Sequence, residues 1–194
     1  STVMSYLNFY LTKELKESDW YHANSTKNMN KLYEKYEITY AKNKRQIEKY
    51  LIYNSKIKYI ILRIHNVIGK KDFSKKTIKF ILSSKTVMDV NIKNNDFFQF
   101  TYDIDLIEII KKLIVNPPKS SSIFNICNEK IKASKFYMIR DKYINNKRIA
   151  KGDDHFPFPK NVLMKNNKIK RRLNYKFIFF EKIIKNFSLS NEFK

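Results

Sequence analysis

A tyrosine and a lysine stand four residues apart, at Tyr40 and Lys44, within residues 37–48. On a helix, residues i and i+4 lie one turn apart on the same face, so the Lys44 ammonium group can reach the edge of the Tyr40 ring. An ammonium group beside a phenol favours the phenolate, which makes the two side chains a candidate acid–base pair for proton transfer. The spacing alone does not establish catalysis, because 13 Tyr and 40 Lys+Arg in 194 residues also produce it by chance.

The composition describes a folded, strongly basic chain. A length of 194 residues with 43% hydrophobic residues suits one domain, or one and a half, with a proper core. The formal charge of +22 is of the kind seen in proteins that bind nucleic acids or other polyanions. However, the lysines are spread along the whole length, and the richness in Lys, Asn, Ile, Tyr and Phe with only 2 Gly and 4 Pro indicates an A+T-rich genome. We therefore interpret most of the charge as solvated surface and keep RNA binding as an alternative.

Several kinds of site are disfavoured by the residue counts. The single cysteine, Cys127, excludes an internal disulfide and a cysteine-based zinc site, which fits a reducing compartment. His22, His65 and His155 are scattered, so no metal site is predicted. The sequence contains no run of 18 apolar residues and no signal-peptide pattern, so we expect a cytoplasmic protein without a membrane segment.

The elements around the Tyr–Lys pair predict an α/β arrangement. A helix is expected from residue 37 or 40 to residue 53, and a strongly apolar strand over residues 57–64. Near-continuous hydrophobicity of this kind is typical of a parallel strand buried on both faces. Helical periodicity predicts that the core face of the helix carries Ile47, Tyr50 and Leu51, and that its solvent face carries Arg45, Glu48 and Lys49.

Other stretches of the chain predict further elements. The beginning of residues 1–6 looks like the end of a strand, residues 77–82 like a helix, residues 86–102 like short strands and residues 122–126 like another strand. Asp105 is expected to cap a helix, with Glu108 reaching back, and Asn116-Pro117-Pro118 to end it. Ser134 is expected to cap a helix that runs to about residue 144, and two short helices are predicted over residues 167–173 and 179–187.

Six segments, taken in order, resemble a known set of motifs. Residues 1–6 look like the motif Ser-Ser/Thr-x-x-Val-Tyr-Gly, and residues 40–48 look like Tyr-x-x-Ser-Lys-x-x-x-Glu. Residues 61–69 look like Leu-Arg-x-x-Asn-Val-Tyr-Gly, and residues 100–106 look like Arg-Asp-Phe-x-Tyr-Val-Asp-Asp-Leu. Residues 123–126 look like Tyr-Asn-Val-Gly, and residues 167–175 look like Lys-x-Arg-x-x-Leu-Gly-Trp/Tyr. These motifs belong to the extended short-chain dehydrogenase/reductase family, the nucleotide-sugar epimerases and dehydratases. The chain therefore resembles this family over essentially its whole length.

The resemblance implies a fold and a set of ligands. The implied fold class is α/β, the C-terminal part of a Rossmann-type parallel sheet with a small α/β substrate-binding lobe. Residues 1–68 and 103–128 would belong to the Rossmann portion, and residues 69–102 and 129–194 to the lobe. The implied cofactor is NAD or NADP, the implied substrate is a nucleotide-activated sugar, and the implied assembly is a homodimer.

The resemblance also implies roles for individual residues. Tyr40 would exchange a proton with a sugar hydroxyl, and Lys44 would favour its phenolate and hold the nicotinamide ribose. Thr2 would hydrogen-bond the reacting oxygen of the substrate. Asn66 would lie beside both the nicotinamide and the substrate, and His65 would be a pocket or packing residue rather than a general base. The implied catalytic residues are thus Thr2, Tyr40 and Lys44; cofactor binding falls to Tyr40, Lys44 and Asn66, and substrate binding to Thr2, His65 and Asn66.

The departures from the family pattern narrow the range of reactions that the resemblance implies. A Gly-x-Gly-x-x-Gly turn, which binds pyrophosphate at a helix N-terminus, is absent, because the only glycines are Gly69 and Gly152. By family order this turn would precede Ser1. Val3 and Met4 stand where dehydratases carry acidic residues, which favours an epimerase or reductase, and Phe98 stands where an arginine often contacts substrate phosphate. A catalytically degenerate member that serves as a structural or interaction subunit therefore remains an alternative.

Overall fold

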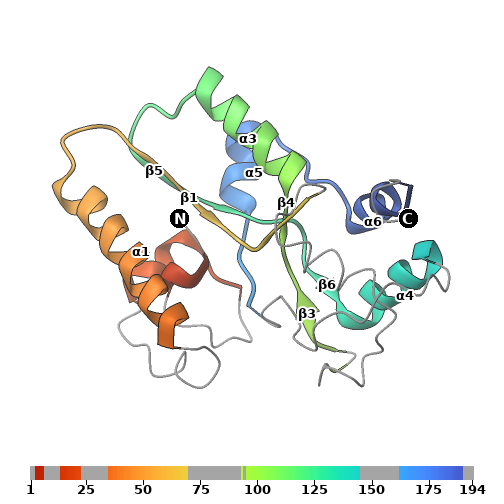
Figure 1. Cartoon of the computed structure of the whole chain (residues 1–194). Coiled ribbons are helices and arrows are strands. Elements are labelled where there is room, and N and C mark those ends of the chain that lie inside the picture. Colours follow the sequence, from red (N-terminus) through yellow and green to blue (C-terminus); the bar gives the residue numbers. More distant parts are fainter. Residues whose placement is uncertain are drawn as a thin grey trace.

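The computed structural model describes residues 3–6, 14–22, 35–69, 93, 95–144 and 162–189. Its elements, in chain order (Figure 1), are the 3-10 helices η1 (Val3–Tyr6) and η2 (Glu17–His22), α1 (Lys35–Asn54), β1 (Ile60–Ile64), β2 (Val67–Ile68), β3 (Phe97–Phe98), β4 (Thr101–Tyr102), α3 (Asp103–Val115), β5 (Ser122–Ile126), β6 (Ile131–Lys132), α4 (Ala133–Ile144), α5 (Asn167–Leu173) and α6 (Phe180–Leu189). The predicted helix over residues 77–82 lies outside the described residues, as does part of the predicted strand region 86–102.

A parallel pair of strands, β1 and β5, lies between helices. Ile60 pairs with Ser122 and Ile64 with Ile126, so the two strands are in register over their full length. The predictions of a strand at residues 122–126 and of parallel pairing are confirmed, and β1 is shorter than predicted. Two further pairs are present, β2 with β4 in parallel and β3 with β6 antiparallel.

The two faces of the β1–β5 pair are covered differently. On one face, Leu62 and Ile64 pack in a cluster with side chains of α3 and α5, including Ile109 and Ile169. On the other face, the Arg63 side chain meets α1. Because neighbouring residues of a strand point to opposite faces, α1 and α3 cover opposite sides of this sheet. The arrangement is the α/β architecture that the sequence predicts, and Figure 1 shows the strands between these helices.

The inner face of α1 differs from the predicted one at four positions, whereas Lys49 is exposed as predicted and Leu51 is half-buried. Arg45 is 6% exposed and Glu48 is 1% exposed, whereas Ile47 is 55% exposed and Tyr50 is 66% exposed. The prediction that Arg45 and Glu48 lie outside is therefore wrong, and so is the placement of Ile47 and Tyr50 in the core. The physical reason is that both charged side chains find buried partners on distant segments, which helical periodicity cannot reveal.

Local predictions failed at two element starts, those of α3 and α4. Residues 3–6 form a 3-10 helix, and the strand end predicted at the beginning of residues 1–6 falls where residues 1 and 2 lie outside the described residues. Helix α3 begins at Asp103, so Asp105 lies inside the helix and does not cap it; its carboxylate accepts hydrogen bonds from distant segments instead. Helix α4 begins at Ala133, which places Ser134 inside that helix. The predicted helix end at Asn116 is confirmed, since α3 ends at Val115.

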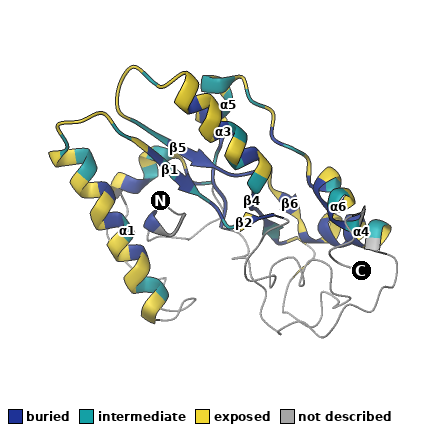
Figure 2. Ribbon diagram, turned by 45° about the horizontal axis from the view of Figure 1, so that its top comes forward, coloured by how far each residue is buried: buried dark blue, intermediate teal, exposed yellow. Residues whose placement is uncertain are grey.

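The second half of the molecule is built around aromatic side chains. Phe136 and Phe180 stack with ring centroids 4.8 Å apart, and Tyr102 meets Phe187 edge to face at 5.9 Å. This cluster joins strands β2, β3 and β4 to helices α4 and α6, and the ribbon in Figure 2 shows the buried faces of α4 and α6 turned toward each other. The cluster comprises Ile68, Phe98, Phe100, Tyr102, Ile131, Ala133, Phe136, Tyr137, Ile139, Phe180, Ile183, Ile184 and Phe187.

Candidate functional site

Tyr40 and Lys44 lie one turn apart on the surface of α1. The Lys44 Nζ atom stands 5.4 Å from the centroid of the Tyr40 ring, which is within the range of a cation–π contact. Tyr40 is 45% exposed and Lys44 is half-buried. The i, i+4 spacing thus brings a phenol and an ammonium group together where a ligand can reach them.

The helix that carries this pair is fixed to β1 by a buried ion pair. Arg63 donates from Nε to Glu48 Oε2 at 3.0 Å, and its Nη2 atom lies 2.9 Å from the same oxygen. Both side chains are almost fully buried. Breaking such a pair leaves an uncompensated charge in the interior, so the pair fixes the position of α1 against the sheet.

Arg63 also ties β1 to the two N-terminal 3-10 helices. Its Nη1 atom donates to the Tyr6 hydroxyl at 3.1 Å and to the Glu17 carbonyl at 2.9 Å. The Tyr6 hydroxyl in turn donates to Asn125 Oδ1 on β5 at 2.6 Å. Burial raises the pKa of Tyr6, so its hydroxyl stays protonated and keeps this donor role.

The candidate residues lie at the carboxyl edge of the sheet. Helix α1 leads through a short connection, residues 55–59, into β1, which runs back along it (Figure 1). The start of α1, with Tyr40, therefore lies on the side of the sheet where β1 ends and His65 and Asn66 follow. In open α/β sheets, ligands bind outside the carboxyl ends of the strands.

His65 is a buried, neutral side chain. It is 1% exposed, its Nδ1 atom accepts a hydrogen bond from the Asn66 backbone N–H at 2.9 Å, and its Nε2 atom lies 2.9 Å from the Val162 carbonyl. The carbonyl can only accept, so the ring proton resides on Nε2. Burial lowers the pKa of His65 to about 4. This imidazole therefore holds the backbone at Asn66 and is not poised as a base at neutral pH.

Two motif segments meet at Gly69. A Cβ atom added at Gly69 would collide with the side chain of Asp103, at the start of α3. Asn66, three residues earlier, is half-buried, and its carbonyl accepts a hydrogen bond from the Thr101 N–H at 2.8 Å. The chain after β1 is therefore held against β4 at Asn66 and lies close to the start of α3 at Gly69.

A second buried polar network joins α3 to the C-terminal segment. The Asp105 carboxylate accepts hydrogen bonds from Asn128 Nδ2 and from the Tyr175 hydroxyl, each at 2.7 Å. Burial raises the pKa of Asp105, although these hydrogen bonds oppose the shift. Asn174, directly before Tyr175, adopts a left-handed backbone with φ of 47°, at the position where the resembling motif has glycine.

Three residues of these networks were not predicted as structural partners from sequence. Arg45 donates to the Ser5 carbonyl at 3.1 Å and to the Trp20 carbonyl at 2.7 Å, and its guanidinium stacks 4.2 Å from the Trp20 ring. Asn128 donates to Asp105, as described above. No local pattern marks Arg45, Trp20 or Asn128, because their partners lie 20 or more residues away in the chain. Thr2, the remaining predicted catalytic residue, lies outside the described residues.

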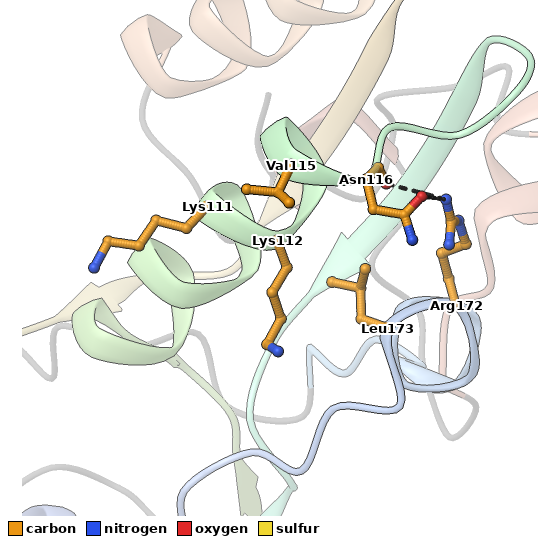
Figure 3. Close-up of a pocket in the computed structure, with 6 residues that line it drawn as sticks. All are labelled: Lys111, Lys112, Val115, Asn116, Arg172 and Leu173. Carbon is orange, nitrogen blue, oxygen red and sulfur yellow. Dashed lines mark hydrogen bonds between the residues drawn. The ribbon is translucent and has the colours of Figure 1, made fainter.

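A surface pocket lies apart from these residues, between the C-terminal ends of α3 and α5. Its volume is about 360 Å³, and its lining consists of Lys111, Lys112, Val115, Asn116, Arg172 and Leu173. Figure 3 shows Arg172 turned toward Asn116, to which it donates, and Lys112 extended away from it. The Arg172 Nη2 group also donates to the Pro117 carbonyl at 3.1 Å, so Arg172 helps to close the end of α3.

Among the described residues, no group of three or more His, Cys, Asp and Glu side chains could hold a metal ion. No helix within the same ranges is long and apolar enough to cross a membrane.

Known proteins resemble this chain in fold. No family model matches the sequence, and no curated protein matches it either. Solved structures do match. The dTDP-glucose 4,6-dehydratase of Bacillus anthracis, in complex with NAD, has a TM-score of 0.60 at 15% identity and covers 97% of this chain. The UDP-glucuronic acid 4-epimerase of Bacillus cereus, also in complex with NAD, has a TM-score of 0.61 at 16% identity and covers 95%. The UDP-glucose 4-epimerase of Thermotoga maritima, with UDP-glucose, has a TM-score of 0.60 at 14% identity and covers 95%.

These similarities show an α/β fold of the Rossmann type. The chain spans 58%, 57% and 59% of the lengths of these three proteins. The fold class predicted from sequence is therefore confirmed.

Proposed function

We propose that this chain forms the catalytic and substrate-binding part of an NAD(P)-dependent epimerase or reductase that acts on a nucleotide-activated sugar. The observation that carries the proposal is the Tyr40–Lys44 pair, exposed on a helix that the Glu48–Arg63 ion pair fixes beside the carboxyl edge of a parallel sheet. Solved structures of the same fold include nucleotide-sugar epimerases and dehydratases, two of them in complex with NAD.

The residues present fit one end of a dinucleotide. Tyr40, Lys44 and Asn66 offer a phenol, an ammonium group and an amide where ligands of open α/β sheets bind, which suits a nicotinamide ribose. The pyrophosphate end has no such counterpart, because the two glycines of the chain, Gly69 and Gly152, cannot form a Gly-x-Gly-x-x-Gly turn. When bound, NAD(P) supplies the hydride acceptor or donor.

The chain's own residues would transfer the proton and orient the sugar. Tyr40 would take a proton from a sugar hydroxyl, or return it, and the adjacent Lys44 would stabilise the phenolate formed in between. Thr2 would donate a hydrogen bond to the reacting oxygen. Asn66 would contact the sugar and the nicotinamide, with its backbone held by His65. Val3 and Met4, in place of acidic residues, favour epimerisation or reduction over dehydration.

Replacing Tyr40 with Phe in the gene product that contains this chain tests the proposal. We expect turnover of a nucleotide sugar to fall at least about 100-fold, because the proton-transfer group is lost. Tyr50→Phe is the matched control, since Tyr50 lies on the same helix and is 66% exposed. Equal turnover of Tyr40→Phe and Tyr50→Phe would contradict the assigned role.

A second candidate is a non-catalytic subunit of the same fold. Phe98, at the position where the family that the motifs resemble often has an arginine in contact with substrate phosphate, is fully buried and packs edge to face against Phe136 at 5.2 Å. The Phe98 side chain packs in the hydrophobic core and carries no charge that could bind a substrate. If purified protein binds neither NAD(H) nor NADP(H) and shows no turnover that depends on Tyr40, the non-catalytic function is favoured. RNA binding would instead appear as affinity that falls steeply with salt.

A further inference from the structure

Three segments that are far apart in the sequence meet at the amino edge of the β1–β5 pair, where both strands begin. Because β1 and β5 are parallel and in register, residues 55–59 and 116–121 both enter the sheet at this edge, and Figure 1 shows the two connections on the same side of the sheet. Helix α3 ends here too, since residues 116–121 connect it to β5. Arg172, in the last turn of α5, donates to the Asn116 carbonyl at 3.0 Å, which brings the end of α5 to the same place.

The amino edge is strongly basic. No Asp or Glu occurs in residues 55–60, 109–122 or 171–174, the parts of the chain that form this edge. All three parts contribute cations that are exposed or half-buried: Lys56, Lys58, Lys111, Lys112, Lys119, Arg171 and Arg172. Lys111 lies 3.0 Å from Glu108, and none of the other cations has a carboxylate partner within the described residues. Lysines that are dispersed along the sequence are thus gathered in space, and such a surface attracts polyanions.

The pocket between α3 and α5 lies within this basic edge (Figure 3). Its volume is about 360 Å³, and its lining includes Lys111, Lys112 and Arg172 but no acidic and no aromatic side chain. The Arg172 Nη2 group donates to the carbonyls of Asn116 and Pro117, whereas its Nη1 and Nε groups have no acceptor within the described residues. A guanidinium with donors to spare beside a lysine is suited to hold a phosphate group.

The composition of the edge favours a nucleic acid over an acidic protein. The cores of protein–protein interfaces are enriched in aromatic residues and depleted in lysine. Interfaces with nucleic acids are much more positively charged, and half or more of their hydrogen bonds go to phosphate and sugar. Because no aromatic ring lines the pocket, it offers no platform on which a base could stack. The contacts available here are therefore contacts to phosphates.

We propose that the amino edge of the β1–β5 pair binds the phosphodiester backbone of a nucleic acid without reading its sequence. The Lys112–Arg172 pocket holds one phosphate, and the surrounding lysines and Arg171 contact its neighbours and displace their counterions. This inference goes beyond the proposed function and does not rest on it. The Tyr40–Lys44 pair lies at the opposite, carboxyl edge of the sheet, so a strand bound at the amino edge leaves that pair accessible.

Fluorescence anisotropy of the gene product that contains this chain tests the surface. The probes are labelled single strands of RNA and DNA of about 20 nucleotides, in two sequences each. We expect all of them to bind within about threefold of one another, because the backbone carries no sequence information. The logarithm of the binding constant should fall with the logarithm of the salt concentration with a slope of about −3, since about four phosphate contacts contribute about 0.7 each.

Two double variants locate the contact. Lys112→Gln/Arg171→Gln is expected to weaken binding at least about tenfold and to reduce the salt slope by about 1.4, because two phosphate contacts are lost. Lys182→Gln/Lys185→Gln removes the same charge from the exposed side of α6, in the aromatic half of the molecule, and is expected to leave the affinity within about twofold. All four side chains are exposed, and circular dichroism and urea unfolding establish that both variants are folded.

The outcomes separate this surface from the proposed dinucleotide site. Lys112→Gln/Arg171→Gln is expected to bind NAD(P) as the wild type does, so loss of nucleic-acid binding with unchanged NAD(P) binding would support the proposal. Protein that binds nucleic acid in this way but binds no NAD(P) would refute the proposed function alone. Equal effects of the two double variants, affinity that does not depend on salt, or displacement of the RNA by polyglutamate at an equal concentration of charge would each overturn the proposed surface.

Discussion

Helices α1 and α6 bury their inner faces by different means. Helix α6 packs apolar side chains into the aromatic cluster, with Ile183, Ile184 and Phe187 fully buried. Helix α1 instead turns Arg45 and Glu48 inward and leaves Ile47 and Tyr50 to solvent. Apolar packing is non-directional and tolerates many neighbours, whereas a buried charge requires a particular partner in a particular place. The helix that carries the Tyr40–Lys44 pair is therefore the one whose position is specified most narrowly.

The largest effect is expected at the ion pair beneath α1. Arg63→Met leaves the Glu48 carboxylate buried without its cation, which costs about 3 to 5 kcal/mol of unfolding free energy. Urea unfolding of wild type and variant measures this loss of unfolding free energy. The double variant Arg63→Met/Glu48→Leu should recover part of the loss, because both charges are then removed. A loss below about 1 kcal/mol in the single variant would mean that the pair does not position α1.

A smaller effect, dependent on pH, is expected at the carboxyl edge of β1. The pKa of His65 is about 4 in the fold, below its ordinary value of 6.5, so the unfolded chain takes up a proton at a pH where the folded chain does not. The resulting stability is present above pH 6.5 and is lost as the pH falls toward 4. Between about pH 7.5 and pH 5, the loss should be about 2 kcal/mol.

His65→Gln isolates this contribution. The glutamine amide can still donate to the Val162 carbonyl, but it does not titrate. Wild type and variant are compared by urea unfolding at both pH values, so that the opposite titration of Asp105, whose pKa is raised by burial, cancels. An equal pH dependence in the two proteins would show that the His65 imidazole is not buried in its neutral form.

Arg45 provides a further test of the difference between α1 and α6. Arg45→Met retains an aliphatic side chain over Trp20 but removes two hydrogen bonds to backbone carbonyls, which should cost about 1 to 2 kcal/mol. Trp20 is the only tryptophan of the chain, so the tryptophan fluorescence reports on the surroundings of this ring, which include Arg45. We expect a red-shifted emission as η2 loosens from α1. Unchanged emission and stability would show that the guanidinium is not required there.

The smallest effect is expected where helical periodicity predicted the core. Ile47→Ala should change the unfolding free energy by less than about 0.5 kcal/mol, since Ile47 is 55% exposed. Its matched counterpart, Ile183→Ala on α6, should cost about 2 to 4 kcal/mol. Equal costs would restore the predicted orientation of α1 and would contradict the inward placement of Arg45 and Glu48.

Local patterns predicted most of the helices and strands but not the side-chain contacts that hold them together. The parallel strands, the end of α3 at Asn116 and the pairing of Tyr40 with Lys44 follow from periodicity, proline and helix geometry, all of which act over a few residues. The inward face of α1 and the true partners of Asp105 could not be predicted in this way. Their partners, such as Arg63 and Tyr175, are brought close only by the fold, and a charged residue gives no local sign that it will be buried.

The six motif segments revealed more than local patterns did, but not every long-range contact. Their order along the chain resembles a family, and the structure brings several of them into contact, as with Glu48 and Arg63, Tyr6 and Asn125, and Gly69 and Asp103. The resemblance therefore gave information on long-range contacts that residue patterns alone lack. It gave none for Arg45, which stands at an unspecified position of its motif, or for Trp20, which lies outside all six segments.

Titration of NAD⁺ and NADP⁺ into the gene product that contains this chain, followed by calorimetry, tests the proposed site most directly. We expect one of the two dinucleotides to bind, Lys44→Ala to weaken its binding at least about tenfold through loss of a charged hydrogen bond, and the exposed neighbour Lys42→Ala to leave it unchanged. Absence of binding, or equal affinities for Lys44→Ala and Lys42→Ala, would contradict the assignment of Tyr40 and Lys44 to a dinucleotide site.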